Sequence, residues 1–183
     1  MKETKIDDQG VAESNAGHEK KFDECQLVGF RVGAQEFGVD IRQVREIIRG
    51  VALAKLPDSP DFIEGVVNLR GSVTPVVDLR KKFSLEERTH ENEMRIIVTE
   101  LKSGPVGFMV DNVTEVRTVK AEAIESVPAT AIKGNSHYVK GIAKLESGLL
   151  IMLDFEEVLS SDEAEALSLS KTAVAVSTGN TSR

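Results

Sequence analysis

The stretch GVVNLRGSVTPVVDLR, residues 65–80, contains two short apolar runs separated by a polar turn. The runs cover residues 65–69 and 73–79, and the turn between them is Arg70-Gly71-Ser72. Two runs of strand length around a glycine-bearing turn predict a β-hairpin. Asp78 lies where the second run ends and a short helix is expected, so we predict that its carboxylate caps that helix.

The same arrangement occurs at three other places in the chain. Apolar runs flank glycine-containing turns at residues 26–32 with 37–40, 94–101 with 106–110, and 141–145 with 149–153. Only brief helices are expected between these hairpins, at residues 42–48, 60–64, 79–83 and 154–159. Many short strands joined by glycine-bearing turns favour small β-barrels over a parallel α/β sheet.

The order of these segments repeats along the chain. Gly65 lies thirteen residues before Asp78, and Gly141 lies thirteen residues before Asp154, with apolar residues at matching positions between them. An earlier pair of blocks recurs in the same order, FGVD and VREI at 37–40 and 44–47, then FMVD and VTEV at 108–111 and 113–116. Matched blocks in one order indicate a duplication. We therefore predict a mostly β domain over residues 24–162, made of two tandem barrels at about 24–90 and 91–162, with a groove where they meet.

The composition limits the kinds of partner. The 30 acidic and 23 basic residues give a net charge of −7, which disfavours nucleic acid and anionic membranes because both attract clustered Lys and Arg. No apolar run approaches the ~20 residues that a membrane-spanning helix requires, so no direct membrane insertion is expected. Residues 1–23 are polar without a signal-peptide core, and residues 163–183 are rich in Ser, Thr and Ala. We expect both segments to be flexible tails, with a short amphipathic continuation around Leu167 and Leu169 as the alternative for the second, and we expect the protein to be cytoplasmic.

The sequence lacks the residue patterns that are typical of catalysis or metal binding. The three histidines His18, His90 and His137 have no Cys, His or carboxylate at metal-ligand spacing. No glycine-rich phosphate-binding motif precedes a helix, and Cys25 has no evident base to activate it as a nucleophile. We predict that the protein is not an enzyme, holds no metal or cofactor, and works by binding other proteins.

Two polar residues stand among apolar ones in positions that allow two interpretations. Arg70 in the hairpin turn is either a solvated arginine in a local salt bridge or an arginine that anchors a partner, as arginine does at many interfaces. Glu46, between Val44 and Ile47, presents the same choice. Val44 and Ile47 are themselves of a type found more often in a core than at an interface. The residues alone leave these alternatives open.

The blocks described above resemble, in order, the signature blocks of the CheW family, the coupling proteins of bacterial chemosensory arrays. The resemblance spans about residues 24–160, which is nearly all of the expected domain. The residues that carry it are FGVD (37–40), VREI (44–47), GVVNLRG (65–71), PVVDLR (75–80), VDNVTEV (110–116), YVKGI (138–142) and IMLD (151–154).

This resemblance implies two five-stranded, SH3-like barrels with a hydrophobic seam between them. It implies a scaffold that binds the cytoplasmic tips of methyl-accepting chemoreceptors and the regulatory domain of the histidine kinase CheA, recruited to receptor arrays. Carried over position by position, the residues implied in receptor binding are Val44, Glu46, Ile47, Asn68, Leu69, Arg70 and Gly71. Those implied in kinase pairing or barrel integrity are Gly107, Val113 and Gly141.

Two other functions stay open at this point. A protein of the same family can serve a chemosensory-type pathway with another output, such as surface motility or development, and the receptor that co-purifies would identify that pathway. A small-ligand-binding β-barrel, or an enzyme without a recognisable motif, is the rival from a different class. A tight, stoichiometric small ligand would support this rival and count against the scaffold.

Overall fold

The computed structural model describes residues 24–85, 94–128 and 137–168. The expected N-terminal tail, residues 169–183 of the expected C-terminal tail, and the histidines His18 and His90 lie outside the described residues. The strands are β1 (Glu24–Val32), β2 (Gln35–Asp40), β3 (Glu46–Arg49), β4 (Ile63–Leu69), β5 (Ser72–Asp78), β6 (Arg95–Leu101), β7 (Gly104–Val110), β8 (Asn112–Lys120), β9 (Ile124–Glu125), β10 (Val139–Leu145) and β11 (Gly148–Leu153). The short helices are the 3₁₀ turns η1 (Ile41–Gln43) and η2 (Ala121–Ala123) and the α-helices α1 (Leu79–Lys82) and α2 (Phe155–Val158).

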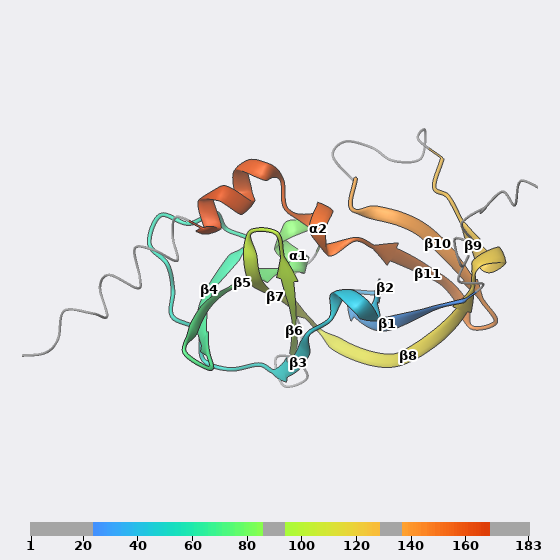
Figure 1. Ribbon diagram of the computed structural model, residues 1–183, viewed down its shortest axis with the longest axis horizontal. Helices are drawn as coiled ribbons and strands as arrows, with labels where there is room; N and C mark the ends of the chain where they lie inside the picture. Colours follow the sequence, from blue (N-terminus) through green and yellow to red (C-terminus); the bar gives the residue numbers. More distant parts are fainter. Residues whose placement is uncertain (1–23, 86–93, 129–136, 169–183) are drawn as a thin grey trace, which may run out of the picture.

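These strands form two sheets (Figure 1). The six-stranded sheet has the order β8-β1-β2-β11-β10-β9, and the five-stranded sheet has the order β3-β6-β7-β5-β4. Neighbouring strands are antiparallel except in the β2–β11 and β5–β7 pairs, which are parallel. The described chain is therefore mostly β, and all four expected hairpins are present.

The two sheets are not consecutive along the chain. The β1–β2 hairpin pairs with β11 from the second half of the sequence, and the β6–β7 hairpin pairs with β5 from the first half. Each sheet thus contains strands from both halves, and the expected division into tandem units at residues 24–90 and 91–162 does not match the observed sheets. The alternation of apolar residues indicates which face of a strand is buried, but it does not indicate which strand lies beside it.

The duplication is nevertheless visible at matching positions in the two sheets. Gly65 in β4 and Gly141 in β10 each follow a register shift in the hairpin that ends at a capping aspartate. A Cβ atom on Gly65 would lie 2.5 Å from the carbonyl oxygen of Ala54, and one on Gly141 would lie 3.0 Å from that of Glu125. In both sheets a short segment, at Ala54 in one and Glu125 in the other, therefore approaches the first strand of the hairpin at the same place, where only a glycine permits the close approach.

Two of the four expected helices are present, and each begins after an aspartate that caps it, as predicted for Asp78. Asp78 accepts a hydrogen bond from the backbone N–H of Arg80 (2.9 Å) at the start of α1. Asp154 accepts one from the backbone N–H of Glu156 (3.1 Å) at the start of α2. The matching aspartates of the two repeats therefore have the same local role.

The helices expected at residues 42–48 and 60–64 are wrong. The first region forms only the 3₁₀ turn η1 before it enters β3, where β-branched Ile47 and Ile48 suit an extended strand paired with β6. In the second region the N–H of Ile63 donates to the carbonyl of Pro60 (2.9 Å), which closes a single turn before β4 begins. Short isolated helices have little stability of their own, so strand pairing decides both regions.

The hydrophobic core has three parts. The largest lies between the two sheets and takes side chains from both; at its centre the rings of Phe108 and Phe155 are 4.3 Å apart. A second cluster belongs to the six-stranded sheet and includes Leu150, and a third belongs to the five-stranded sheet and includes Ile96. The expected hydrophobic seam is therefore the main core of the molecule, and we call it the seam core below.

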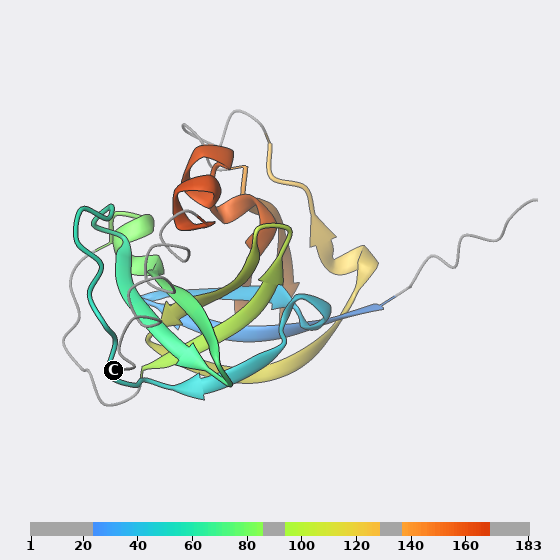
Figure 2. The same cartoon turned by 60° about the vertical axis from the view of Figure 1, so that its left-hand side comes forward.

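Beyond α2 the chain forms a helical segment, residues 161–168, that packs beside α1 (Figures 1 and 2). Its start is a capping box, since the N–H of Glu163 donates to Ser160 Oγ (3.3 Å) and the N–H of Ser160 donates to Glu163 Oε2 (2.8 Å). Leu167 is 4% exposed and belongs to the seam core. The helical continuation expected as the alternative around Leu167 is therefore present at residues 161–168, and the flexible tail expected from residue 163 does not describe residues 163–168, which are held by Leu167, Ala164 and the Lys82–Glu163 ion pair.

Candidate partner-binding site

The turn between β4 and β5 holds four of the predicted receptor-binding residues. Arg70 and Gly71 both have positive φ angles, 53° and 85°, as in the two-residue turns that β-hairpins favour. The side-chain oxygen of Asn68 accepts a hydrogen bond from the N–H of Gly71 (2.9 Å). Asn68 and Gly71 thus shape the turn, and Arg70 at its tip has a side chain that is 79% exposed.

Arg70 pairs with Glu46, another of the predicted residues. Its Nη2 lies 3.1 Å from Glu46 Oε2. Glu46 is on β3 at one edge of the five-stranded sheet and Arg70 follows β4 at the other edge, so the pair joins the two edges. An exposed pair of this kind stabilises a fold by about 0–1 kcal/mol. The local salt bridge is therefore observed. Most of the Arg70 side chain nevertheless remains exposed to solvent, and its binding to a partner stays a prediction.

The apolar members of the predicted receptor site differ in exposure. Ile47, next to Glu46 on β3, is 41% exposed. Val44 is half-buried against the seam core, and Leu69 is half-buried against the cluster of the five-stranded sheet. The Arg70–Glu46 pair thus brings the β4–β5 turn to β3, where Ile47 is the exposed apolar side chain, while Val44 and Leu69 pack in two different core clusters.

The three predicted kinase-pairing residues do not form one patch. Gly107 is on β7 in the five-stranded sheet, whereas Val113 on β8 and Gly141 on β10 belong to the six-stranded sheet and are separated by three strands. Both glycines are buried, and a Cβ atom on Gly107 would lie 2.6 Å from Ile96 Cγ2. Val113 is half-buried and packs on the seam core. Close packing thus accounts for the two glycines, in agreement with the barrel-integrity alternative.

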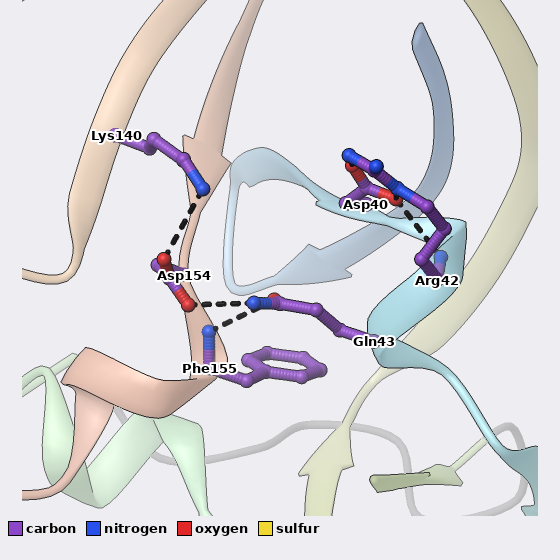
Figure 3. Close-up of polar contacts among 6 residues, drawn as sticks. All are labelled: Asp40, Arg42, Gln43, Lys140, Asp154 and Phe155. Carbon is purple, nitrogen blue, oxygen red and sulfur yellow. Dashed lines mark hydrogen bonds and ion pairs between the residues drawn. The ribbon is translucent and has the colours of Figure 1, made fainter. Parts of the chain in front are cut away.

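A polar junction that the sequence did not reveal lies between η1 and the start of α2 (Figure 3). Gln43 Nε2 donates to Asp154 Oδ1 (2.6 Å), and Gln43 Oε1 accepts from the backbone N–H of Phe155 (3.2 Å). Lys140 Nζ lies 3.2 Å from the other oxygen of Asp154. Gln43 and Asp154 are 111 residues apart in the chain, so no motif spacing could have paired them.

The carboxylates near this junction are held in their charged form. Burial raises the pKa of Asp154, but hydrogen bonds from Gln43 and Lys140 and the charge of Lys140 outweigh it, so the pKa is lowered from its ordinary value. The pKa of Asp40 is lowered too, chiefly by the side-chain hydrogen bond from Arg42, against the effect of its partial burial. Both aspartates therefore stay ionised acceptors at neutral pH.

A groove of about 1030 Å³ opens beside this junction, at the end of the six-stranded sheet. Its lining combines apolar Ile124 and Met152 with charged Asp40, Arg42 and Lys140. Cys25 also lines it, but burial and the charge of Asp40 raise the pKa of the thiol and so disfavour the reactive thiolate. Within residues 24–85, 94–128 and 137–168, no three His, Cys, Asp or Glu side chains are arranged to hold a metal ion.

None of the helices in the described part of the chain is long and apolar enough to cross a membrane. Comparison with known families gives a more specific result: residues 26–163 match the family model of the CheW-like domain. The chain belongs to the CheW-like family. The resemblance seen in the sequence blocks is thereby confirmed over nearly all of the described residues.

Individual relatives of this CheW-like chain agree with that assignment. It is 37% identical over 134 residues to the chemotaxis protein CheW of Klebsiella aerogenes, which covers 73% of this chain and 81% of the relative. It is 34% identical over 141 residues to the chemotaxis protein CheW of Bacillus subtilis, covering 77% and 90%. The crystal structure of the scaffolding protein TtCheW from Thermoanaerobacter tengcongensis superposes with a TM-score of 0.70 at 32% identity, over 76% of this chain and 94% of that one. The chain is thus a chemotaxis scaffold protein of the CheW-like family rather than an enzyme.

Proposed function

We propose that this CheW-like scaffold couples the cytoplasmic tips of chemoreceptors to the regulatory domain of a CheA-type histidine kinase. The observation that carries the receptor half of the proposal is the Glu46–Arg70 pair, which leaves the Arg70 side chain 79% exposed. Ile47, the next residue of β3, is 41% exposed on the opposite face of the strand and adds apolar contact area at the same edge of the sheet. Arginine surrounded by apolar contacts is a common centre of protein–protein interfaces.

The arrangement of the two sheets supports binding of two partners at once. The receptor surface lies on β3 and the β4–β5 turn of the five-stranded sheet, whereas Val113 is on β8 of the six-stranded sheet. A kinase surface that includes β8 therefore need not overlap the receptor surface. Each contact can be weak, because an array that repeats both contacts gains avidity from multivalency. In this proposal the protein works in the cytoplasm and is recruited to receptor arrays.

The test of this function is the charge reversal Arg70→Glu. It places a carboxylate opposite Glu46 and removes the exposed guanidinium, while the backbone keeps the same positive φ requirement. We expect binding to a purified receptor-tip fragment to weaken about tenfold or more, because hot-spot arginines contribute about 2 kcal/mol. The melting temperature should change by less than about 3 °C, since the broken pair is exposed.

A matched control is available in the other sheet. Lys144 on β10 forms another solvent-exposed ion pair, with Glu125 (2.6 Å), in which the side chains are 59% and 60% exposed. Lys144→Glu should leave receptor binding unchanged. Equal weakening by the two variants, or a loss of binding that follows the melting temperature, would show that the Arg70 surface is not the receptor site.

A further inference from the structure

The 3₁₀ turn η1 is where the chain crosses from one sheet to the other. It follows β2 of the six-stranded sheet and leads within a few residues to β3 of the five-stranded sheet. Asp40 fixes its start by accepting hydrogen bonds from the N–H and Nε of Arg42, both at 2.9 Å. The path of the chain after this crossover determines where β3, with Glu46 and Ile47, is placed.

Gln43 fixes the end of the crossover through three contacts with two different elements, the start of α2 and β6. Its side chain binds Asp154 and the N–H of Phe155 at the start of α2 (Figure 3). Its backbone carbonyl accepts a hydrogen bond from Thr99 Oγ1 (2.5 Å) on β6, and Thr99 is 1% exposed. The next link is the N–H of Arg45, which donates to the Val98 carbonyl (2.8 Å) and begins the pairing of β3 with β6.

The chemistry of the junction requires a side chain that donates and accepts at the same time. The amide of Gln43 donates to a carboxylate and accepts from the first N–H of α2, which has no partner inside the helix. A carboxylate at this position could only accept and would face Asp154 with a like charge. An ammonium group could only donate and would leave the N–H of Phe155 without its acceptor.

The second crossover of the duplicated fold is also fastened to a short helix, but through the residue that matches Asp40 in the repeat rather than the one that matches Gln43. There the chain passes from β7 to β8, and Asp111 at that junction accepts hydrogen bonds from Arg80 Nε on α1 (2.7 Å) and from the N–H of Gly33 (2.7 Å). In each case a residue at the crossover is bound to the short helix that follows the last strand of a repeat. A contact that occurs at both crossovers, once as an ion pair and once through Gln43, has an architectural role at each.

We propose that Gln43 is a positioning residue that locks the first crossover and thereby holds β3 in place for partner binding. Its side chain touches no partner in this proposal and acts through the backbone that leads to Glu46 and Ile47. The binding half of the inference rests on the proposed receptor function. The structural half, that Gln43 fixes the crossover to α2, stands on the contacts themselves and is measured separately.

The test first replaces Gln43 with its carboxylate isostere, glutamate. A second substitution, Asp154→Asn, then exchanges the donor and acceptor roles of the two residues. Gln43→Glu puts two carboxylates in contact, and Lys140 can neutralise only part of that charge. We expect the amide hydrogens of Phe155 and of β3 to exchange about tenfold faster, and the receptor-tip fragment to bind about tenfold more weakly, the effect of losing about one hydrogen bond to a charged group. Adding Asp154→Asn supplies the missing donor from the other side, at the position of the oxygen that also caps α2, so it should restore both measurements in part.

Two controls accompany the pair of variants. Asp154→Asn alone keeps an oxygen facing Gln43 and Glu156 and should change exchange and binding by less than about threefold. Gln35→Glu makes the same amide-to-acid change on β2, where Gln35 is exposed and bonds only to the neighbouring Glu36 carbonyl among the contacts described, and it should change neither measurement.

The outcomes separate the inference from the proposed function. If Gln43→Glu leaves amide exchange at Phe155 and β3 unchanged, or if Asp154→Asn does not restore it, Gln43 is not a lock and the inference is wrong. If exchange rises and is restored while receptor binding stays constant, the crossover does not position the binding surface, and the positioning role is overturned. A wild-type chain that binds no receptor fragment contradicts the proposed function, and amide exchange still decides the structural half.

Discussion

The side chain of Arg80 on α1 holds Asp111 at the β7–β8 junction through paired hydrogen bonds, one of them 2.7 Å from Nε to Oδ1. The two side chains are only 13% and 17% exposed. The same carboxylate accepts a hydrogen bond from Gly33 in the turn between β1 and β2, so three separate segments meet at Asp111. An ion pair that is this well shielded and hydrogen-bonded contributes more than a surface pair does.

We predict that Asp111→Asn lowers the free energy of unfolding by about 2–4 kcal/mol, because it replaces the largely buried carboxylate that accepts from Arg80 and Gly33 by a neutral amide, one of whose two polar atoms is itself a donor. The measurement is urea unfolding at neutral pH. Lys144→Ala, which breaks the exposed pair with Glu125, should cost less than about 1 kcal/mol. Similar losses for these two variants would mean that Asp111 contributes no more than an ordinary surface charge.

The buried glycine on β7 leads to a prediction about kinase pairing. Gly107→Ala should lower the free energy of unfolding by about 1–3 kcal/mol, because its Cβ would overlap Ile96 Cγ2 at 2.6 Å. Loss of binding to the kinase regulatory domain should follow the loss of stability. Ile96→Leu removes the branch that carries this methyl group at nearly constant volume, so the double variant should recover most of the stability.

If Gly107→Ala instead weakens kinase binding while its urea midpoint stays at the wild-type value, the glycine belongs to the binding surface and not to the packing of the sheet. The recovery by Ile96→Leu makes the steric cause specific. Without that recovery, the overlap with Ile96 is not the origin of the loss.

The features that depend on neighbours in the chain could be predicted from the sequence. The four hairpins follow from apolar runs around glycine-bearing turns, and Asp78 and Asp154 cap the helices that follow them. The partner of each hairpin could not be predicted, because apolar alternation is compatible with several neighbours. The exchange of hairpins between the two repeats therefore appears only in the structure.

The candidate site was predictable to the same extent. The turn around Arg70 has a local signature, but its pairing with Glu46 depends on β3 and β4 forming the two edges of one sheet. Gln43 and Asp154 meet only because the fold brings η1 next to the start of α2, although the two residues are 111 positions apart in the chain. Leu167 is one leucine in a Ser- and Ala-rich stretch, and its burial depends on a surface formed by distant residues.

We predict that Leu167→Ala lowers the free energy of unfolding by about 2–3 kcal/mol, the usual cost of truncating a buried leucine. Leu167 is 4% exposed, belongs to the seam core and lines a small cavity together with Leu56 and Phe62. Amide exchange should rise in residues 161–168 as well. Leu149→Ala is the matched control, since Leu149 is 59% exposed and should cost less than about 0.5 kcal/mol. Equal costs would show that the helical segment does not anchor the fold.

The ion pair at the start of this helical segment gives a pH-dependent prediction. Lys82 Nζ lies 2.6 Å from both carboxylate oxygens of Glu163 and 4.6 Å from the centre of the Phe62 ring. Burial raises the pKa of Glu163, whereas hydrogen bonds from Lys82 and the Ser160 N–H lower it. The hydrogen bonds outweigh burial, so the pKa lies below the ordinary value of 4.5. A carboxyl group whose pKa is lower in the folded state stabilises the fold above its unfolded pKa, and that contribution is lost as the pH falls through the folded pKa.

Glu163→Gln should therefore lower the free energy of unfolding by about 1–2 kcal/mol at pH 7, where the wild-type carboxylate is charged. The difference between variant and wild type should shrink as the pH is reduced below about 4.5, because the wild-type group then becomes neutral as well. Urea unfolding of both proteins between pH 7 and pH 3 measures this difference directly, and the other acidic groups cancel in the comparison. Glu125→Gln, at an exposed pair, should show a smaller difference at pH 7. A difference for Glu163→Gln that stays constant across this range would mean that the carboxylate charge does not hold the helical segment to Lys82.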